Sequence, residues 1–348
     1  MPISQINHLP HPLGTLLFHY SRTEDYQPEF TSMTRPNTIA QQIADLQGRY
    51  GASPQSLDDI ILLVPKAQVE ARKREFPDVT VHPLTFAASE LKAEHWRFLM
   101  GLVGGQRSLY VQQMNMIMRT LRQQLTVEAL HREVDRSNLT EQLKRFARLR
   151  IEIAAQYIDD TQSISTLVKP GRLIIVDLRD GFTQEDEALG LFVVLLQIFS
   201  EVTYHGKRFN KLVVFDEAHK YIQNDDLVDE LKRVVAEMRH KGTSILIASQ
   251  DPRSVHPSLI ELSTQIILHR FNSPDWLKHI QRANTALGTL TAEKMNNLQS
   301  GEVYAWSREA SDRAFSTDVV KVRCRPRVTR HGGATKTAVS SADNHEES

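Results

Sequence analysis

Short apolar runs separated by amphipathic stretches dominate the chain from residue 170 to residue 270. The runs are rich in Val, Ile and Leu, and they cover residues 173–176, 212–215, 244–248 and 265–268. Residues 187–202 and 226–240, which lie between them, have the three- and four-residue spacing of helices. Strands that are apolar throughout and are separated by helices predict a parallel sheet covered on both faces.

The amino-terminal half predicts shorter strands and then a long helical segment. The strands are expected at residues 15–20, 60–64 and 79–82, and the helical pattern runs from about residue 89 to residue 157. One helix face is expected to be buried, because apolar residues recur there at helical spacing: Leu139, Leu143, Phe146, Leu149 and Ile153. The basic residues between them predict a solvated helix face in preference to a DNA contact.

Composition narrows the class of protein without choosing a function. The 348 residues are 41% hydrophobic and 24% charged, which is ordinary for one large or two smaller globular domains. Lys plus Arg and Asp plus Glu both number 42, so any DNA-binding surface has to be a local patch. The single cysteine, Cys324, excludes an internal disulfide. With no signal peptide and no apolar run long enough to span a bilayer, we expect a cytoplasmic protein without a membrane partner.

Polar side chains follow two of the predicted strands. Asp216 and Glu217 come directly after residues 212–215, and Gln250 follows residues 244–248. The carboxyl ends of parallel strands meet at one edge of a sheet, where ligands collect. An aspartate there can bind Mg²⁺, the adjacent glutamate can polarise water, and a glutamine can sense a γ-phosphate. Taken alone, the two carboxylates could equally cap the next helix.

Arg239 lies at the end of the predicted helix 226–240. It could complement the helix dipole, or it could be an arginine finger offered to the nucleotide of a neighbouring subunit.

These residues belong to a pattern that resembles the carboxyl-terminal half of a HerA-type ATPase, in the HerA/FtsK group of ring-forming DNA translocases. The resemblance covers residues 171 to about 306, and its pieces are GRLIIVDLRDGF, KLVVFDEAHKYI, EMRHKG and ILIASQDPRSVHPSLIELSTQIILHRF. It implies an α/β fold of the P-loop NTPase (RecA/FtsK-like) type, a parallel sheet flanked by helices with a helical insertion at about residues 85–165.

The resemblance also implies roles for single residues. Asp216 would be the magnesium aspartate, Glu217 the catalytic base, Gln250 the sensor and Arg239 the finger acting in trans. The cofactors would be ATP and Mg²⁺. His219 fits the family's Asp-Glu-Ala-His pattern as a supporting residue. The family's Gln-Arg-Pro is replaced here by Gln-Asp-Pro, with Arg253 displaced along the chain.

The resemblance divides the chain into three parts: a leader (1–14), an ATPase core (15–321) and a basic extension (322–348). In the family such an extension closes over the nucleotide site, so Arg330, Gly332 and Gly333 are candidates to contact phosphates. A flexible basic tail is the alternative. We expect the last dozen residues to be disordered.

A phosphate-binding loop, Gly-x-x-x-x-Gly-Lys-[Ser/Thr], is missing from the sequence. The nearest approach, residues 101–108, has Gln106 and Arg107 where glycine and lysine are required, and we expect a join between helices there. Residues 15–29 resemble the strand and turn that follow the loop helix in the family. The Walker A strand would then lie between strands 244–248 and 265–268. Without it the sheet closes up, another polypeptide supplies the strand, or the chain is part of a longer product.

Two functions follow from these observations. The first is a HerA-like ATPase that in complete form couples ATP hydrolysis to DNA translocation or unwinding, but is inactive alone as printed. The second is a non-catalytic accessory subunit of an intact motor or nuclease. The partners would be DNA and either a homo-oligomeric ring or a hetero-oligomer.

Overall fold

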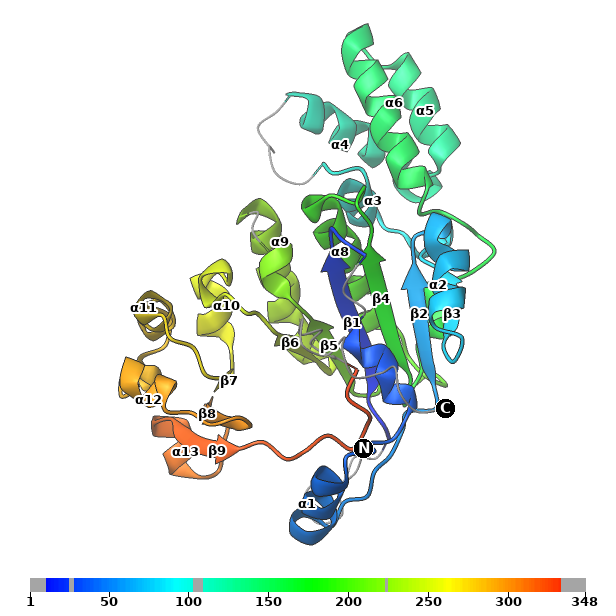
Figure 1. The fold of residues 1–348 in the computed structure, drawn as a ribbon. Helices are drawn as coiled ribbons and strands as arrows, with labels where there is room; N and C mark the ends of the chain where they lie inside the picture. The colour runs from blue at the N-terminus through cyan, green and yellow to red at the C-terminus, as the bar shows by residue number, and fades with distance from the viewer. Residues whose placement is uncertain (1–10, 25–27, 103–108, 223–224, 333–348) are drawn as a thin grey trace.

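Six parallel strands form the central sheet of the protein (Figure 1). The computed structural model describes residues 11–24, 28–102, 109–222 and 225–332, apart from the side chains of residues 123, 225–227, 230 and 239. The strands, in spatial order, are β3 (Thr80–Pro83), β2 (Ile60–Val64), β4 (Leu173–Arg179), β1 (Gly14–Ser21), β5 (Lys211–Phe215) and β6 (Thr243–Ile247). With helices on both faces, this sheet confirms the predicted fold class.

Helices cover the two faces of the sheet unequally. One face packs against α8 (Glu185–Glu201) and α9 (Asp225–Met238), and α3 (Ala93–Leu99) packs on the outer side of α8. The other face packs against α2 (Val69–Glu75) and the 3₁₀ helix η1 (Glu29–Thr34), which cover β2, β4 and β1. Helix α1 (Ala40–Tyr50) lies beyond this layer and ends at Gly51, whose φ of 57° suits a glycine. Most of the covering apolar surface therefore lies on the first face.

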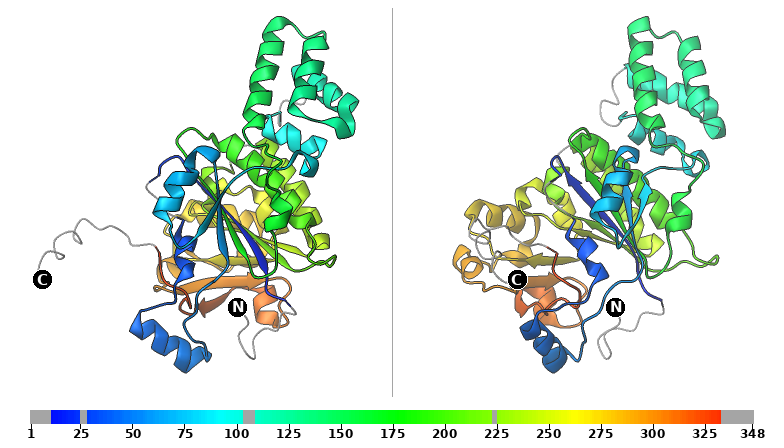
Figure 2. Two further views of the ribbon diagram at one scale, coloured as in Figure 1. Left: turned by 90° about the vertical axis from the view of Figure 1, so that its right-hand side faces the viewer. Right: turned by 45° about the vertical axis from the view of Figure 1, so that its right-hand side comes forward.

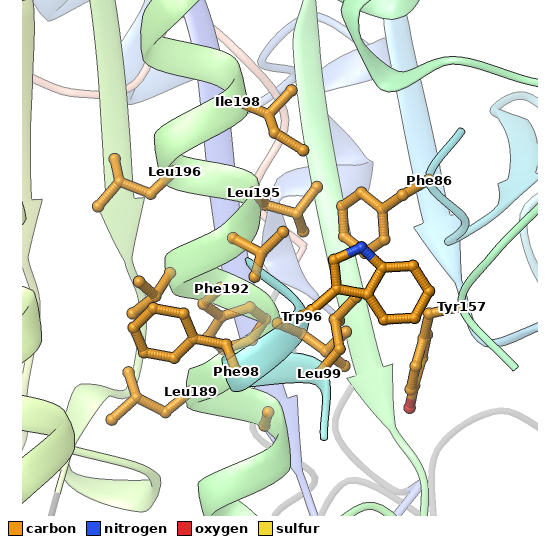
Figure 3. Packing of buried hydrophobic residues seen from close by; sticks show 14 of the residues in the cluster. Phe86, Trp96, Phe98, Leu99, Tyr157, Leu189, Phe192, Leu195, Leu196 and Ile198 are labelled. Carbon is orange, nitrogen blue, oxygen red and sulfur yellow. The ribbon is translucent and has the colours of Figure 1, made fainter. Parts of the chain in front are cut away.

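Helix α8 forms the centre of the core. Its residues 188–196 are all buried, because the sheet lies on one side of the helix and α3 on the other. Figure 3 shows Phe192 and Leu195 of α8 close to Trp96 and Leu99 of α3. The two helices approach closely at Gly190, where an added Cβ would lie 3.2 Å from the carbonyl oxygen of Phe98. None of the described helices is both long enough and apolar enough to cross a membrane.

The predicted helical segment forms a projection of its own. It contains α4 (Leu109–Leu121), α5 (Val127–Arg136) and α6 (Glu141–Ala155), followed by the short α7 (Ile164–Leu167). Figures 1 and 2 show α4–α6 extending beyond the carboxyl ends of the strands. The join between helices expected at residues 101–108 lies largely outside the described residues.

The prediction of which face of α6 is buried is wrong for the middle of the helix. Phe146 and Leu149 are exposed, whereas Ala147, Ile151 and Ala154 are buried. The small side chains of the two alanines let α6 pack closely on α5, and the larger apolar residues are turned outward. Apolar spacing alone did not distinguish these two neighbouring faces.

The predicted strand 265–268 forms, but not in the parallel sheet. It is β7 (Gln265–Leu268), which pairs antiparallel with β8 (Glu302–Ser307), and β8 pairs antiparallel with β9 (Val320–Arg323). Figures 1 and 2 show this second sheet on the β6 side of the first. The helices around it are α10 (Pro257–Leu262), α11 (Pro274–Ala283), α12 (Ala292–Asn296) and α13 (Arg313–Thr317). The expectation that residues 265–268 belong to the parallel sheet is therefore wrong, and among the described strands β6 is the last on that side of the parallel sheet.

A buried histidine in α3 makes the stability of the fold depend on pH. Burial, together with the positive charge of Lys92, lowers the pKa of His95 from 6.5 to about 4. Its Nδ1 accepts a hydrogen bond from the Lys92 amide at 3.0 Å, which requires that nitrogen to be unprotonated. Between pH 6.5 and about pH 4, His95 is protonated in the unfolded chain but not in the folded chain. Acid therefore favours unfolding.

We predict that His95→Gln reduces this pH dependence. From pH 7 to pH 5 the parent should lose about 2 kcal/mol more free energy of unfolding than the variant, as follows from the two pKa values. Urea unfolding at each pH measures the difference, and the carboxylates common to both proteins cancel. Equal losses in the two proteins would contradict the prediction.

Candidate functional site

The end of β5 turns sharply at Glu217. This residue has φ 50° and ψ 41°, the left-handed conformation that residues with a Cβ rarely adopt. The backbone on both sides is fixed by hydrogen bonds, because the Asp216 amide donates to the Phe18 carbonyl and the Ala218 amide donates to the Ala248 carbonyl. The neighbouring strands β1 and β6 therefore hold the turn in a strained form, as is common at functional sites.

Two side chains hold the Glu217 carboxylate. Gln250 Nε2 donates to Oε1 at 2.6 Å, and His219 Nε2 lies 3.3 Å from Oε2. The backbone N–H of Gln250 in turn donates to His219 Nδ1 at 3.4 Å. In the neutral ring Nε2 therefore carries the proton and faces the carboxylate. Each carboxylate oxygen keeps a lone pair for a further donor such as water. The structure thus brings Glu217 and Gln250 together, from the ends of adjacent strands.

Asp216 is held through both its backbone and its side chain. Tyr221 donates its hydroxyl to the Asp216 carbonyl at 2.9 Å. Burial raises the pKa of Tyr221 well above its ordinary value, with the charges of Asp216 and Glu217 adding to the effect, so the phenol stays protonated. The carboxylate oxygen Oδ2 lies 3.2 Å from Nδ1 of His19, whose side chain is only 5% exposed. Within the described residues, Oδ1 makes no hydrogen bond, and it is the oxygen available to a ligand.

The carboxylate of Asp177, near the end of β4, forms ion pairs with two arginines. Arg179 Nη2 lies 2.8 Å from one carboxylate oxygen, and Arg72 Nε lies 3.3 Å from the same oxygen. Arg179 also contacts Glu75 at 3.0 Å, and all four side chains are buried or mostly buried. These ion pairs neutralise the charge of Asp177. The Asp177 carboxylate therefore stabilises the carboxyl-terminal end of β4 and is not available to a ligand.

The backbones of Arg239, Arg330 and Gly332 lie apart from this cluster. Arg239 begins the 3₁₀ helix η6 (Arg239–Lys241), just before β6 and therefore at the amino-terminal edge of the sheet, and its side chain lies outside the described residues. Arg330 donates its amide to the Arg35 carbonyl at 2.8 Å. Gly332 packs against η1, where an added Cβ would lie 2.7 Å from Ser32 Oγ. Gly333 and the rest of the tail lie outside the described residues, as do residues 1–10 of the leader.

Arg253 pairs with its neighbour in sequence. Its Nη2 lies 3.2 Å from Asp251 Oδ2, and both side chains are partly exposed. Hydrogen bonds from the Arg253 side chain lower the pKa of Asp251. Arg253 thus neutralises the charge of Asp251, the aspartate of the Gln-Asp-Pro sequence.

Sequence reasoning missed His19 and Tyr221. His19 lies at the end of the first predicted strand, in register with Asp177 of β4. The position of its strand in the centre of the sheet, beside β5, brings it to Asp216. No local sequence signal reports that adjacency. Tyr221 lies four residues after Glu217, and only the 3₁₀ helix η5 (Ala218–Lys220) turns its hydroxyl back to Asp216.

A scan against models of protein families and a search of curated proteins gave no match. Among solved structures the chain is similar to VirB4 of Thermoanaerobacter pseudethanolicus, with 11% identity, 90% of this chain and 89% of that chain covered, and a TM-score of 0.48. It is also similar to the plasmid coupling protein TrwB in complex with ADPNP, with 10% identity, 93% of this chain and 89% of that chain covered, and a TM-score of 0.48.

A third similar structure is the genome packaging NTPase B204 from Sulfolobus turreted icosahedral virus 2 in complex with AMP. Its identity is 18%, with 47% of this chain and 72% of that chain covered and a TM-score of 0.35. At these identities the similarities concern the fold alone.

We predict that the strain at Glu217 is measurable. Glu217→Gly and Glu217→Ala remove the same side-chain contacts, but only glycine adopts φ 50° without cost. The glycine variant should therefore be more stable than the alanine variant by about 1 kcal/mol. Thermal and urea unfolding provide the comparison. An alanine variant as stable as the glycine variant would show that the turn is not strained.

Proposed function

We propose that this chain provides the Walker B half of a HerA/FtsK-type ATPase motor, which in complete form couples ATP hydrolysis to the movement of DNA. The observation that carries the proposal is the contact of 2.6 Å between Gln250 and Glu217, beside Asp216. It joins the ends of two adjacent parallel strands, where nucleotide sites of α/β sheets lie. The sequence resemblance supplies the reaction class.

In this proposal Glu217 is the general base. It accepts a proton from the water that attacks the γ-phosphorus, while ADP leaves. Gln250 and His219 hold its carboxylate from two sides, so the base is oriented before substrate arrives. In the same proposal the side-chain amide of Gln250 would sense the γ-phosphate.

The donor set at Asp216 fits a magnesium ion that is held mainly by phosphate and water. Among the described residues no group of three or more His, Cys, Asp or Glu side chains could hold a metal ion. Mg²⁺ commonly takes one or two carboxylates and completes its shell with phosphates and waters. When bound, it would neutralise the charge of the β- and γ-phosphates. Asp216 Oδ1 is free for this role, and His19 keeps the carboxylate in one orientation.

Arg239 acts, in this proposal, on the nucleotide of a neighbouring subunit. Its backbone lies at the amino-terminal ends of the strands, opposite to Glu217, which supports a role in trans. In the alternative function, a non-catalytic accessory subunit, Arg239 has the same role but this chain binds no nucleotide itself. ATP hydrolysis that depends on Glu217 distinguishes the two.

We predict negligible ATP turnover for the printed chain, because it lacks a phosphate-binding loop. A version joined at its amino terminus to a strand and a Gly-x-x-x-x-Gly-Lys-Ser loop should hydrolyse ATP and be stimulated by duplex DNA. Glu217→Gln in that version should lower kcat by about 10²- to 10⁴-fold, the usual contribution of a general base. Phosphate release measured with and without DNA gives both values.

The matched control is Glu293→Gln, which changes an exposed glutamate of α12 and should leave turnover unchanged. Turnover by the extended version that survives Glu217→Gln would remove Glu217 from the proposed role. Magnesium-dependent turnover by the printed chain would show that another residue binds the phosphates.

A further inference from the structure

Helix α6 carries a line of mostly apolar side chains on its outer side. Gln142, Phe146, Leu149 and Ile153 follow one another at intervals of four, three and four residues, which places them along one side of the helix. Phe146 is 43% exposed, Leu149 is 56% exposed, and both line a hollow in the surface. The opposite side of α6, which contains Ala147, packs against α5 and α3. We term the four outer positions the α6 seam.

The spacing of the α6 seam is that of a coiled-coil surface without its second helix. Alternating intervals of three and four residues place side chains at the a and d positions of a heptad, which contact a neighbouring helix. Single exposed apolar residues are common on protein surfaces, whereas a continuous apolar patch marks an interaction site. The ring of Phe146 packs against Tyr110 of α4, with 5.3 Å between ring centroids, so the centre of the seam is already ordered.

The side chains beside the α6 seam carry uncompensated positive charge. Arg145 precedes Phe146 and Arg150 follows Leu149, which are the g and e positions that flank a coiled-coil contact. Arg150 lies over the ring of Phe146, and neither arginine forms an ion pair with any described residue. Four acidic side chains of α5 and α6 are already paired: Glu133 with Arg136, Asp135 with Arg148, Glu141 with Lys144 and Glu152 with His131.

Charge and shape together select the occupant of the seam. An amphipathic helix with acidic e and g positions would bury Phe146 and Leu149 and would pair with the two free arginines. A second copy of α6 would bring the same free positive charges to the contact, which opposes association. Phosphates of a nucleic acid could contact the arginines, but they would leave the apolar centre of the seam uncovered.

We propose that the α6 seam binds an amphipathic helix of another protein, with apolar residues at its a and d positions and acidic residues at its e and g positions. The proposal is independent of the ATPase function, because no residue of the seam belongs to the cluster around Glu217. Figures 1 and 2 show α6 in the projection beyond the carboxyl ends of the strands, so the bound helix lies on that side of the molecule.

The test measures the binding of fluorescent helical peptides to the full chain by anisotropy. The acidic peptide is as long as α6, with Leu at a and d and Glu at e and g, and repulsion among its own glutamates opposes self-pairing. A second peptide has Lys in place of Glu. The acidic peptide should bind at least about tenfold more tightly than the basic one, because the contacts with Arg145 and Arg150 change from attraction to repulsion.

A change in the centre of the seam should abolish most of the binding. Leu149→Ser should weaken binding of the acidic peptide by about tenfold or more, because the side chain is central in the contact. Leu149 is exposed, so the temperature of unfolding should stay the same. The matched control is Met116→Ser, which changes an apolar residue of α4 that is 66% exposed and lies outside the seam. It should leave the affinity unchanged.

A charge reversal tests which peptide the seam prefers. Arg145→Glu should weaken binding of the acidic peptide and strengthen binding of the basic one, a pattern that loss of folding cannot produce. Arg119→Glu makes the same change in net charge at an exposed arginine of α4, and it should preserve the preference for the acidic peptide.

Five results would overturn the proposal. The first three are no binding of the acidic peptide, equal affinity for the two peptides, and an affinity that Leu149→Ser leaves unchanged. Self-association of the chain that Leu149→Ser abolishes would assign the seam to a second copy. Tighter binding of duplex DNA than of the acidic peptide, lost in Arg145→Glu, would assign it to nucleic acid.

Discussion

Parallel pairing of β5 with β1 on one side and β6 on the other is the constraint on which the site depends. It brings three strand ends to one edge, so that His19, Asp216 and Gln250 become neighbours although they are far apart in sequence. The amides of Asp216 and Ala218 are bonded to β1 and to the segment after β6. A change in either pairing would move the carboxylates relative to their partners.

The same hydrogen bonds hold Glu217 in its left-handed conformation. Such a conformation costs of order 1 kcal/mol, and it persists only where neighbouring structure determines it. The bonds on both sides of the turn provide that determination, and the core around α8 keeps the strands in place. The geometry of Asp216 and Glu217 thus depends on burial far from them, because both side chains are partly open to solvent.

Much of the fold could be predicted from local pattern. The strand at Ile60–Val64 and the helix over residues 185–201 have strong periodic signals, and their bounds are recovered closely. Strand pairing could not be predicted in this way, because apolar spacing does not say which strands are adjacent. For that reason β7 was expected in the wrong sheet, and His19 was not recognised beside Asp216. Asp216, Glu217 and Gln250 could be chosen as candidates because they closely follow two strong strands, and their roles stay predictions.

The polar groups at the ends of β5 and β6 satisfy one another. Glu217 accepts from Gln250 and lies against His219, while Asp216 is held by His19 and Tyr221. A buried or half-buried carboxylate without such partners would raise its pKa or move into solvent. These contacts hold the carboxylates of Asp216 and Glu217 in one arrangement within this chain.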